Sequence, residues 1–228
     1  GDANRNGTLE YCEAHPEWYG LRGGERRFRI RGGFGDNFCT ANPHACDELT
    51  RNIVGALAGG GTDGKTPPLL AQAEKRPWET ARWHHADSIN FWTLDGGTWC
   101  ACEKCRARGT PTDRNLLLVH RLRREIREAM ADGRLRRNVQ VAFLAYADVI
   151  APPSRPLPAD FDYPNCIATF FPIRRCYVHR LDDPRCDVNA GYVRQYAGWT
   201  MDPDRHYRGR IFIGEYYNVS GFKCLPIV

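Results

Sequence analysis

The chain has 228 residues, of which 42% are hydrophobic, and its formal net charge at pH 7 is +5. This length suits one domain with a sizeable core, and the sequence contains no apolar run long enough to cross a bilayer. The basic residues gather in two stretches, 22–31 and 121–137, and the second lies on an expected helix as a solvated face. Nucleic-acid binding calls for a denser basic stripe with interleaved aromatic residues, so we expect no nucleic-acid partner.

The first elements are a loop-like stretch, 1–33, and a short strand expected over 36–40. Asn42 then has the character of a helix N-cap, with Pro43 at the first helical position. Apolar residues recur at helical spacing after it and predict a helix over 43–58. This order of strand, cap and helix is the first βα unit of the predicted fold.

The segment Gly59–Thr66 matches the phosphate-loop pattern G-x-x-x-x-G-K-[ST]. That pattern binds phosphates where a strand leads into a helix, whose N-terminal N–H groups hold the ligand. Here the segment follows a helix, and Pro67-Pro68 removes two N–H groups from any helix that starts there. The sequence therefore favours a surface loop over a nucleotide site.

The stretch 86–105 organises the rest of the chain. A buried strand is expected over 88–94, followed by Asp95 and two glycines, and then by Cys100, Cys102 and Cys105. A carboxylate just past the carboxyl end of a strand is where α/β barrels keep catalytic groups. The alternative is a turn aspartate that caps the next segment.

The second half alternates helices and strands. A helix is predicted to start at the Thr110 cap and end at Gly133, followed by an apolar strand over 139–146 that suits burial on both faces. A strand over 166–171 and an amphipathic helix around 192–199 come next. The last predicted strand covers 210–217, with Glu215 and Tyr216 near its carboxyl end.

Five strands separated mostly by helices indicate the α/β class with a parallel sheet. The polar residues gather after the strands, as at the catalytic face of a (β/α) barrel, although an open doubly wound sheet has a similar alternation. We therefore expect a partial (β/α)8 TIM-like barrel in which 1–228 form a single incomplete domain. Because the chain opens on Gly1 rather than Met, we expect it to be an internal fragment of a longer protein.

Ten cysteines are many for a cytosolic enzyme and indicate either disulfides in an oxidising compartment or a metal site. Cys176 and Cys186 are the most plausible disulfide pair. Cys100, Cys102 and Cys105 have two interpretations. They form disulfides with Cys39, Cys46 or Cys166, or they hold zinc together with one more cysteine. The paired C-x2-C spacing usual for zinc is absent, which favours disulfides.

Four segments resemble a known family: HPEWYGLRGGERR, SINFWTLDGGTWCACEKC, RRCYVHRLDDPRCDVN and GEYYN. Together they resemble the domain-of-unknown-function 4838 family of bacterial proteins, which is similar in fold to the β-hexosaminidase and α-glucuronidase barrels. The resemblance implies an exported TIM-like barrel that acts on glycans, with its signal peptide outside this fragment.

Glycoside hydrolysis needs two carboxyl groups beside the scissile bond. On this interpretation Asp95 is the general acid and Glu215 is the nucleophile or base, and no cofactor is needed. The alternative is a non-catalytic glycan-binding or scaffold domain with a degenerate barrel site. The candidate substrate-binding residues are His15, Asn42, Trp92, Tyr146, Arg174, Arg175, His179 and Tyr216.

Overall fold

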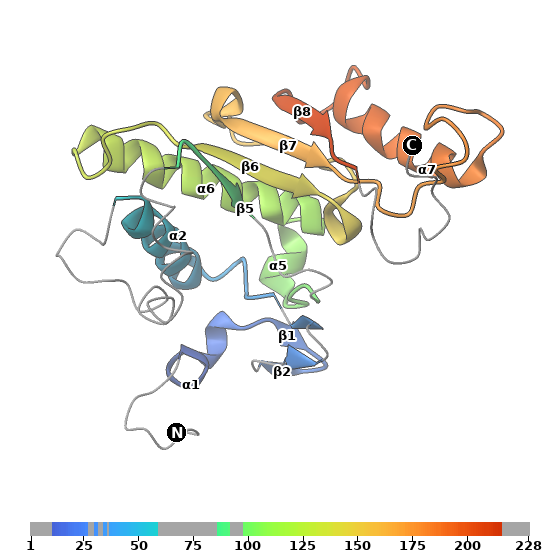
Figure 1. The fold of residues 1–228 in the computed structure, drawn as a ribbon. Helices are drawn as coiled ribbons and strands as arrows, with labels where there is room; N and C mark the ends of the chain where they lie inside the picture. Colours follow the sequence, from blue (N-terminus) through green and yellow to red (C-terminus); the bar gives the residue numbers. More distant parts are fainter. Residues whose placement is uncertain are drawn as a thin grey trace.

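The computed structural model describes residues 11–26, 30–31, 34–35, 37–58, 86–91 and 98–215. These residues form a mixed α/β structure around a four-stranded parallel sheet in the order β5-β6-β7-β8 (Figure 1). The sheet strands are β5 (Ser88–Phe91), β6 (Gln140–Ala145), β7 (Cys166–Phe170) and β8 (Arg210–Ile213).

The helices lie mainly between these strands in the sequence. The α-helices are α1 (Tyr11–Ala14), α2 (Pro43–Leu57), α5 (Glu103–Ala107), α6 (Pro111–Ala131) and α7 (Asp187–Thr200). The 3-10 helices are η1 (Pro16–Trp18), η4 (Ala147–Val149) and η5 (Tyr163–Asn165). Two short antiparallel pairs lie outside the main sheet: β1 (Leu21–Arg22) with β2 (Glu25–Arg26), and β3 (Ile30–Arg31) with β4 (Phe34–Gly35). Among the described residues, none of the helices combines the length and the apolar character that a membrane span requires.

The α/β class and the parallel sheet are confirmed, with four predicted strands in the sheet. The strand predicted over 36–40 is wrong for the residues described there, because Phe38 forms only an isolated antiparallel bridge with Tyr19. The neighbouring backbone is bonded elsewhere: the Asn37 N–H donates to the Thr98 carbonyl at 2.9 Å, and the Cys39 N–H donates to the Trp18 carbonyl at 2.7 Å. This segment therefore joins the N-terminal part of the chain rather than the sheet.

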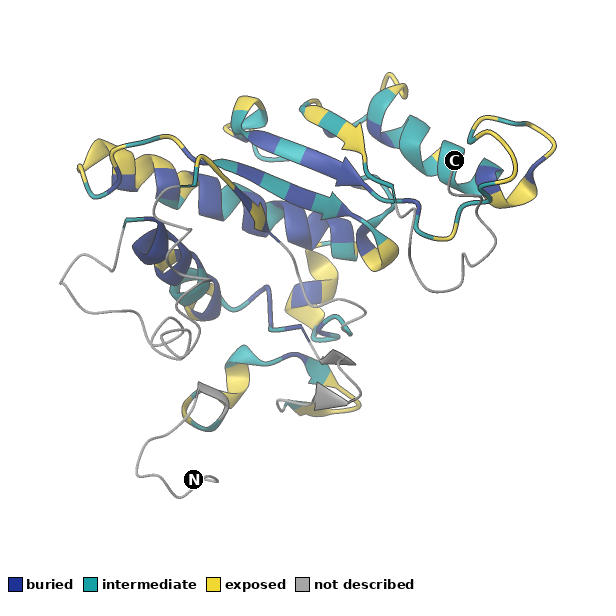
Figure 2. Cartoon of the chain, viewed as in Figure 1, coloured by how far each residue is buried: buried dark blue, intermediate teal, exposed yellow. Residues whose placement is uncertain are grey.

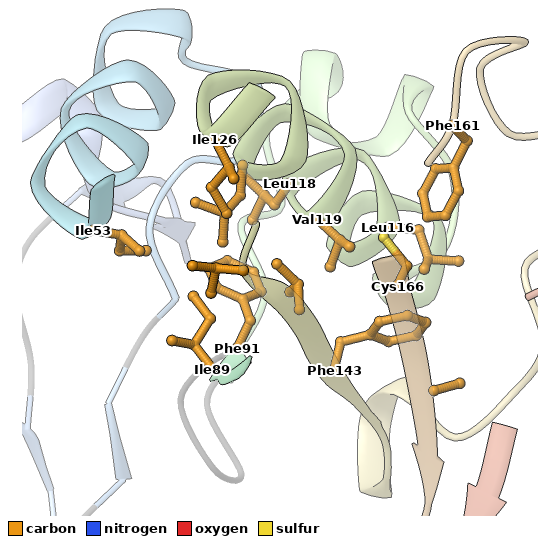
Figure 3. Close-up of a cluster of buried hydrophobic side chains, with 14 of the residues drawn as sticks. Ile53, Ile89, Phe91, Leu116, Leu118, Val119, Ile126, Phe143, Phe161 and Cys166 are labelled. Atoms are coloured by element: carbon orange, nitrogen blue, oxygen red, sulfur yellow. The ribbon is translucent and has the colours of Figure 1, made fainter. Parts of the chain in front are cut away.

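Burial on both faces, predicted for the strand over 139–146, is also corrected. In β6 buried residues alternate with half-buried ones, and Val141, Phe143 and Ala145 form the fully buried face (Figure 2). That face lies against α6, whose buried residues include Leu116, Val119 and Ile126 (Figure 3). The two outer strands of the sheet are β5 and β8, and the sheet does not close within the described residues.

A cluster of aromatic side chains packs α7 and the following loop against the core. Trp199 and Tyr207 are each 1% exposed, and each ring packs close to Phe143 of β6. The Trp199 indole N–H donates to the Ile150 carbonyl at 2.8 Å, and the Tyr207 hydroxyl lies 2.9 Å from the Cys166 carbonyl. Burial raises the pKa of Tyr207. Both polar groups thus have partners inside the core, as buried polar atoms require.

The start of α6 is held by a capping box. The Asp113 N–H donates to the Thr110 hydroxyl at 3.2 Å, and the Thr110 N–H donates to the Asp113 carboxylate at 2.8 Å. The Ser154 N–H and hydroxyl also donate to this carboxylate, at 2.7 and 2.6 Å. Burial acts to raise the pKa of Asp113, but these hydrogen bonds outweigh it and the pKa is lowered.

Gly109 precedes this box in a conformation that side chains rarely adopt, with φ of +104°. A Cβ at Gly109 would lie 2.3 Å from an oxygen of the Asp113 carboxylate. We therefore expect Gly109→Ala to lower the free energy of unfolding by about 1–3 kcal/mol, measured by urea denaturation. Gly133→Ala is the matched control, since Gly133 has φ of +80° but no atom near its absent Cβ. An equal loss in both variants would show that the contact with Asp113 contributes nothing.

Candidate functional site

The carboxyl ends of the four parallel strands lie along one edge of the sheet, the edge at which α/β proteins bind ligands. Tyr146 directly follows β6, and the segment 171–177 follows β7. Gly214 and Glu215 follow β8. Chain connectivity thus brings polar residues that are far apart in the sequence to the same edge.

Glu215 and Arg175 form an ion pair at this edge. The Arg175 Nε donates to Glu215 Oε2 at 3.0 Å, and the two side chains are only 13% and 20% exposed. The guanidinium lies over the Tyr177 ring, 4.0 Å from its centroid, and Nη1 donates to the Cys176 carbonyl at 3.3 Å. Because several groups hold the guanidinium, the Glu215 carboxylate is oriented by a fixed partner.

Gly214 sets the position of Glu215 through close packing. Its N–H donates to the Phe170 carbonyl at 2.9 Å, which extends the pairing of β8 with β7. A Cβ at Gly214 would lie 1.9 Å from the Phe171 ring. Only glycine allows the Phe171 ring to pack against the backbone at this position. Steric contact therefore explains why a glycine directly precedes Glu215.

The loop between β7 and α7 is organised by Asn189, which has 0% exposure. Its Oδ1 accepts from the Cys176 N–H at 2.7 Å. Its Nδ2 donates toward three carbonyl groups, those of Cys176 and Arg180 at 3.0 Å and that of His179 at 3.4 Å. One buried amide thus fixes the loop that carries Arg175, although no motif in the sequence marks Asn189.

The structure does not bring all predicted site residues together. His15 stacks on Trp18, with ring centroids 4.0 Å apart, and Asn42 caps α2 by accepting from the Ala45 N–H at 3.1 Å. Both therefore have local structural contacts in the N-terminal part. Arg174 and His179 are exposed in the loop after β7. Trp92, Asp95 and Tyr216 lie outside the described residues, as does the segment 59–66.

A further carboxylate at this edge was missed by the sequence analysis. Asp148 follows β6 closely and accepts a hydrogen bond from the Trp99 indole N–H. The Arg114 guanidinium lies over the Trp99 ring, 5.2 Å from its centroid. Its position just after a strand could have identified Asp148 from the sequence, because the same position identified Asp95 and Glu215.

The eight cysteines whose side chains the structure describes are unbridged. The sulfur atoms of Cys39, Cys100, Cys102 and Cys105 all lie within 4.8 Å of one another. Thus Cys39 is the cysteine that joins the three clustered ones. Cys46 instead donates to the Thr40 carbonyl, and Cys166 lies in the main core.

A second group consists of Cys176, His179 and Cys186, whose ligand atoms also lie within 4.8 Å of one another. The Cys176 Sγ lies 3.3 Å from His179 Nδ1. Hydrogen bonds from the His179 backbone N–H and ring, and from the Val178 N–H, lower the pKa of Cys176 to about 7. The sulfur atoms of Cys176 and Cys186 lie within 4.8 Å of each other but are not bonded. A disulfide between them therefore stays a prediction.

A pocket of about 340 Å³ lies elsewhere, between the beginning of α2 and the outer side of α6. None of the predicted site residues lines it. Its lining is basic, with Arg108, Arg121 and Arg124, but the first two have partners in the Thr40 carbonyl and the Asp47 carboxylate. The pocket is therefore separate from the chemistry at the sheet edge.

No protein-family model, curated protein or solved structure matches the chain. The side chains at the sheet edge are therefore the structural basis for a function.

Proposed function

We propose that the chain is part of a glycoside hydrolase barrel that acts on a glycan in an exported protein, as the resemblance to the domain-of-unknown-function 4838 family implies. The observation that carries the proposal is the half-buried Glu215, which lies at the carboxyl end of β8 and is paired with Arg175 at 3.0 Å. Barrel enzymes place their catalytic carboxylates at this end of the strands.

The chemistry assigns Glu215 as the nucleophile or base and Asp95 as the general acid. Arg175 orients the Glu215 carboxylate through a charge-assisted hydrogen bond. On this proposal the rings of Tyr146 and Tyr216 stack on sugar rings. Exposed cationic side chains in the loop after β7 suit hydroxyl groups or the carboxylate of an acidic sugar.

Strand spacing ties the reaction to a curved sheet. The strand before Asp95 is β5 and the strand before Glu215 is β8, so three spacings separate them. At about 4.8 Å per spacing, a flat sheet would hold these strands about 14 Å apart. Retaining and inverting glycosidases need carboxyl separations of about 5–5.5 Å and 6.5–9.5 Å. The side chains and the segments that follow the two strands must therefore close the difference, as they do in a barrel because they converge on its axis.

The proposal is tested with a panel of aryl glycosides and oligosaccharides. We expect turnover by the wild-type protein and a loss of about 10²–10⁴-fold in kcat for Glu215→Gln and for Asp95→Asn, because an amide cannot transfer the proton or act as the nucleophile. Asp182→Asn is the control for the chemical change, because Asp182 is exposed and pairs with Arg180 in the loop.

Unchanged turnover in both site variants would contradict the choice of carboxylates. Saturable glycan binding by the wild-type protein without turnover would instead support the non-catalytic binding domain. Circular dichroism of each variant separates loss of chemistry from loss of fold, since Asn and Gln keep the shape of the carboxyl groups that they replace.

A further inference from the structure

The four sulfur atoms of Cys39, Cys100, Cys102 and Cys105 have the spacing of a metal-binding tetrahedron. The Cys39 Sγ lies 3.8 Å from the Cys102 Sγ and 3.7 Å from the Cys105 Sγ. With a Zn–S bond of about 2.3 Å, the edge of a regular ZnS4 tetrahedron is about 3.8 Å. We propose that these four cysteines bind one zinc ion in a structural site.

Polar groups around the cluster lie within reach of its sulfur atoms. The Leu21 N–H donates to the Cys100 Sγ at 3.2 Å, and the Arg26 guanidinium reaches the same sulfur at 3.8 Å. The Thr40 hydroxyl lies 3.6 Å from the Cys105 Sγ. Four thiolates around Zn²⁺ carry a net charge of −2, which these donors and the Arg26 charge offset. Such donors to the ligand atoms are the usual second layer of a protein metal site.

Three separate parts of the chain supply the ligands and their donors. Cys39 precedes α2, Cys100 and Cys102 precede α5, and Cys105 lies within α5. The β1–β2 hairpin completes the site, since the Ala101 N–H donates to the Leu21 carbonyl at 2.9 Å, and Figure 1 shows this hairpin next to α5. One ion would therefore join segments that contribute little to the main hydrophobic core.

Glycine at position 20 is required for this convergence. A Cβ at Gly20 would lie 2.4 Å from the Asn37 carbonyl oxygen and 3.6 Å from the Cys100 Cα. The segment that leads into the β1–β2 hairpin thus passes close to the backbone of Asn37, two residues before Cys39. Arg114 adds a further link by donating from Nη1 to the Cys100 carbonyl at 2.9 Å.

The geometry separates a single tetrahedral metal ion from disulfides and from iron–sulfur clusters, and zinc is the usual ion of a closed structural site with four cysteine ligands. Disulfides would join the sulfurs in two pairs at about 2.05 Å, whereas here one sulfur has two near neighbours at almost equal distances. Iron–sulfur clusters place several metal ions between the cysteines and need a wider cage than sulfurs within 4.8 Å provide. Three of the four cysteines are buried, and a closed site of four protein ligands is the structural zinc type.

The test is the metal content of the protein purified without added metal. We expect elemental analysis to find one zinc ion per chain, and Cys39→Ser and Cys102→Ser to lower the zinc content to background. The control is Cys166→Ala, which removes a buried cysteine outside the cluster and should keep the zinc.

A second measurement covers the case in which the serine variants do not fold. Cobalt exchanged into the wild-type protein should give the thiolate-to-metal charge-transfer bands and the intense visible bands of tetrahedral Co²⁺. A strong chelator should lower the Tm of the wild-type protein, because metal binding and folding are coupled. The proposal is overturned by metal-free protein with two disulfides among these cysteines, or by iron in place of zinc. Neither result depends on whether the sheet edge is catalytic.

Discussion

Replacing Arg123 with alanine is expected to destabilise the protein by about 3–5 kcal/mol. The Arg123 guanidinium is 2% exposed, and its Nε and Nη2 donate to one oxygen of Asp162 at 3.0 and 2.7 Å. Nη2 also donates to the Asn138 side chain at 3.0 Å, and Nη1 donates to the Val139 carbonyl. The truncation leaves the largely buried Asp162 carboxylate and the Val139 carbonyl without their partner. The free-energy cost of burying an unpaired charge exceeds the attraction that the ion pair itself contributed.

Urea denaturation of matched variants measures this effect. Arg127→Ala is the control for an exposed arginine on the same helix, since Arg127 is 45% exposed and lies 3.6 Å from Asp160. We expect that change to stay within about 1 kcal/mol. The double variant Arg123→Met with Asp162→Leu should recover much of the loss, because no charge is then left unpaired. A double variant as unstable as Arg123→Ala would contradict the ion-pair explanation.

The same pair predicts a dependence on pH. Burial acts to raise the pKa of Asp162, but the hydrogen bonds from Arg123 and Asn165 outweigh it and the folded-state pKa is lowered. A carboxyl group with a lowered folded-state pKa stabilises the protein above its unfolded pKa of about 3.9 and loses that contribution as the pH falls. The stability difference between the wild-type protein and Arg123→Ala should therefore shrink below about pH 4.

Local sequence signals predicted the long helices α2 and α6 and located the four sheet strands, although β8 ends at Ile213 and the predicted strand ran to 217. The Asn42 cap with Pro43 and the Thr110 capping box are short-range features, and the structure has both. The expected strand over 36–40 failed for a long-range reason. Its backbone bonds to Trp18 and Thr98, and its cysteine joins the sulfur cluster. The residues of a short apolar segment do not indicate whether its backbone will pair in a sheet or bond to a distant loop.

The candidate site was predictable only as far as topology allowed. Parallel strands put their carboxyl ends at one edge, which correctly placed Glu215 and the loop after β7 together. The partner of Glu215 could not be chosen from the sequence, because Arg174 and Arg175 are adjacent and only one of them faces the carboxylate. The choice of Cys39 over Cys46 and Cys166 likewise depends on contacts between distant parts of the chain.

The Asn189 side chain offers the second large effect. In Asn189→Asp an oxygen replaces the Nδ2 donor that faces the carbonyl groups of Cys176, His179 and Arg180. The shape is unchanged and Oδ1 still accepts from the Cys176 N–H, but the carboxylate oxygen in place of Nδ2 then faces three acceptors. We expect a loss of about 3 kcal/mol or more in the free energy of unfolding at pH 7, because each buried group left unsatisfied costs about 1–3 kcal/mol and a charge costs more.

The pH dependence of this variant separates the loss of a donor from a general packing defect. Burial among acceptors raises the folded-state pKa of the new aspartate above its unfolded value of about 3.9. The native state then binds more protons than the unfolded state, so the variant should lose stability relative to the wild-type protein as the pH rises above 4. Asn42→Asp is the matched control, since aspartate caps a helix as well as asparagine does. A loss that does not change with pH would show that the new aspartate has the same pKa in the folded and unfolded states, and would contradict the burial of its carboxylate among acceptors.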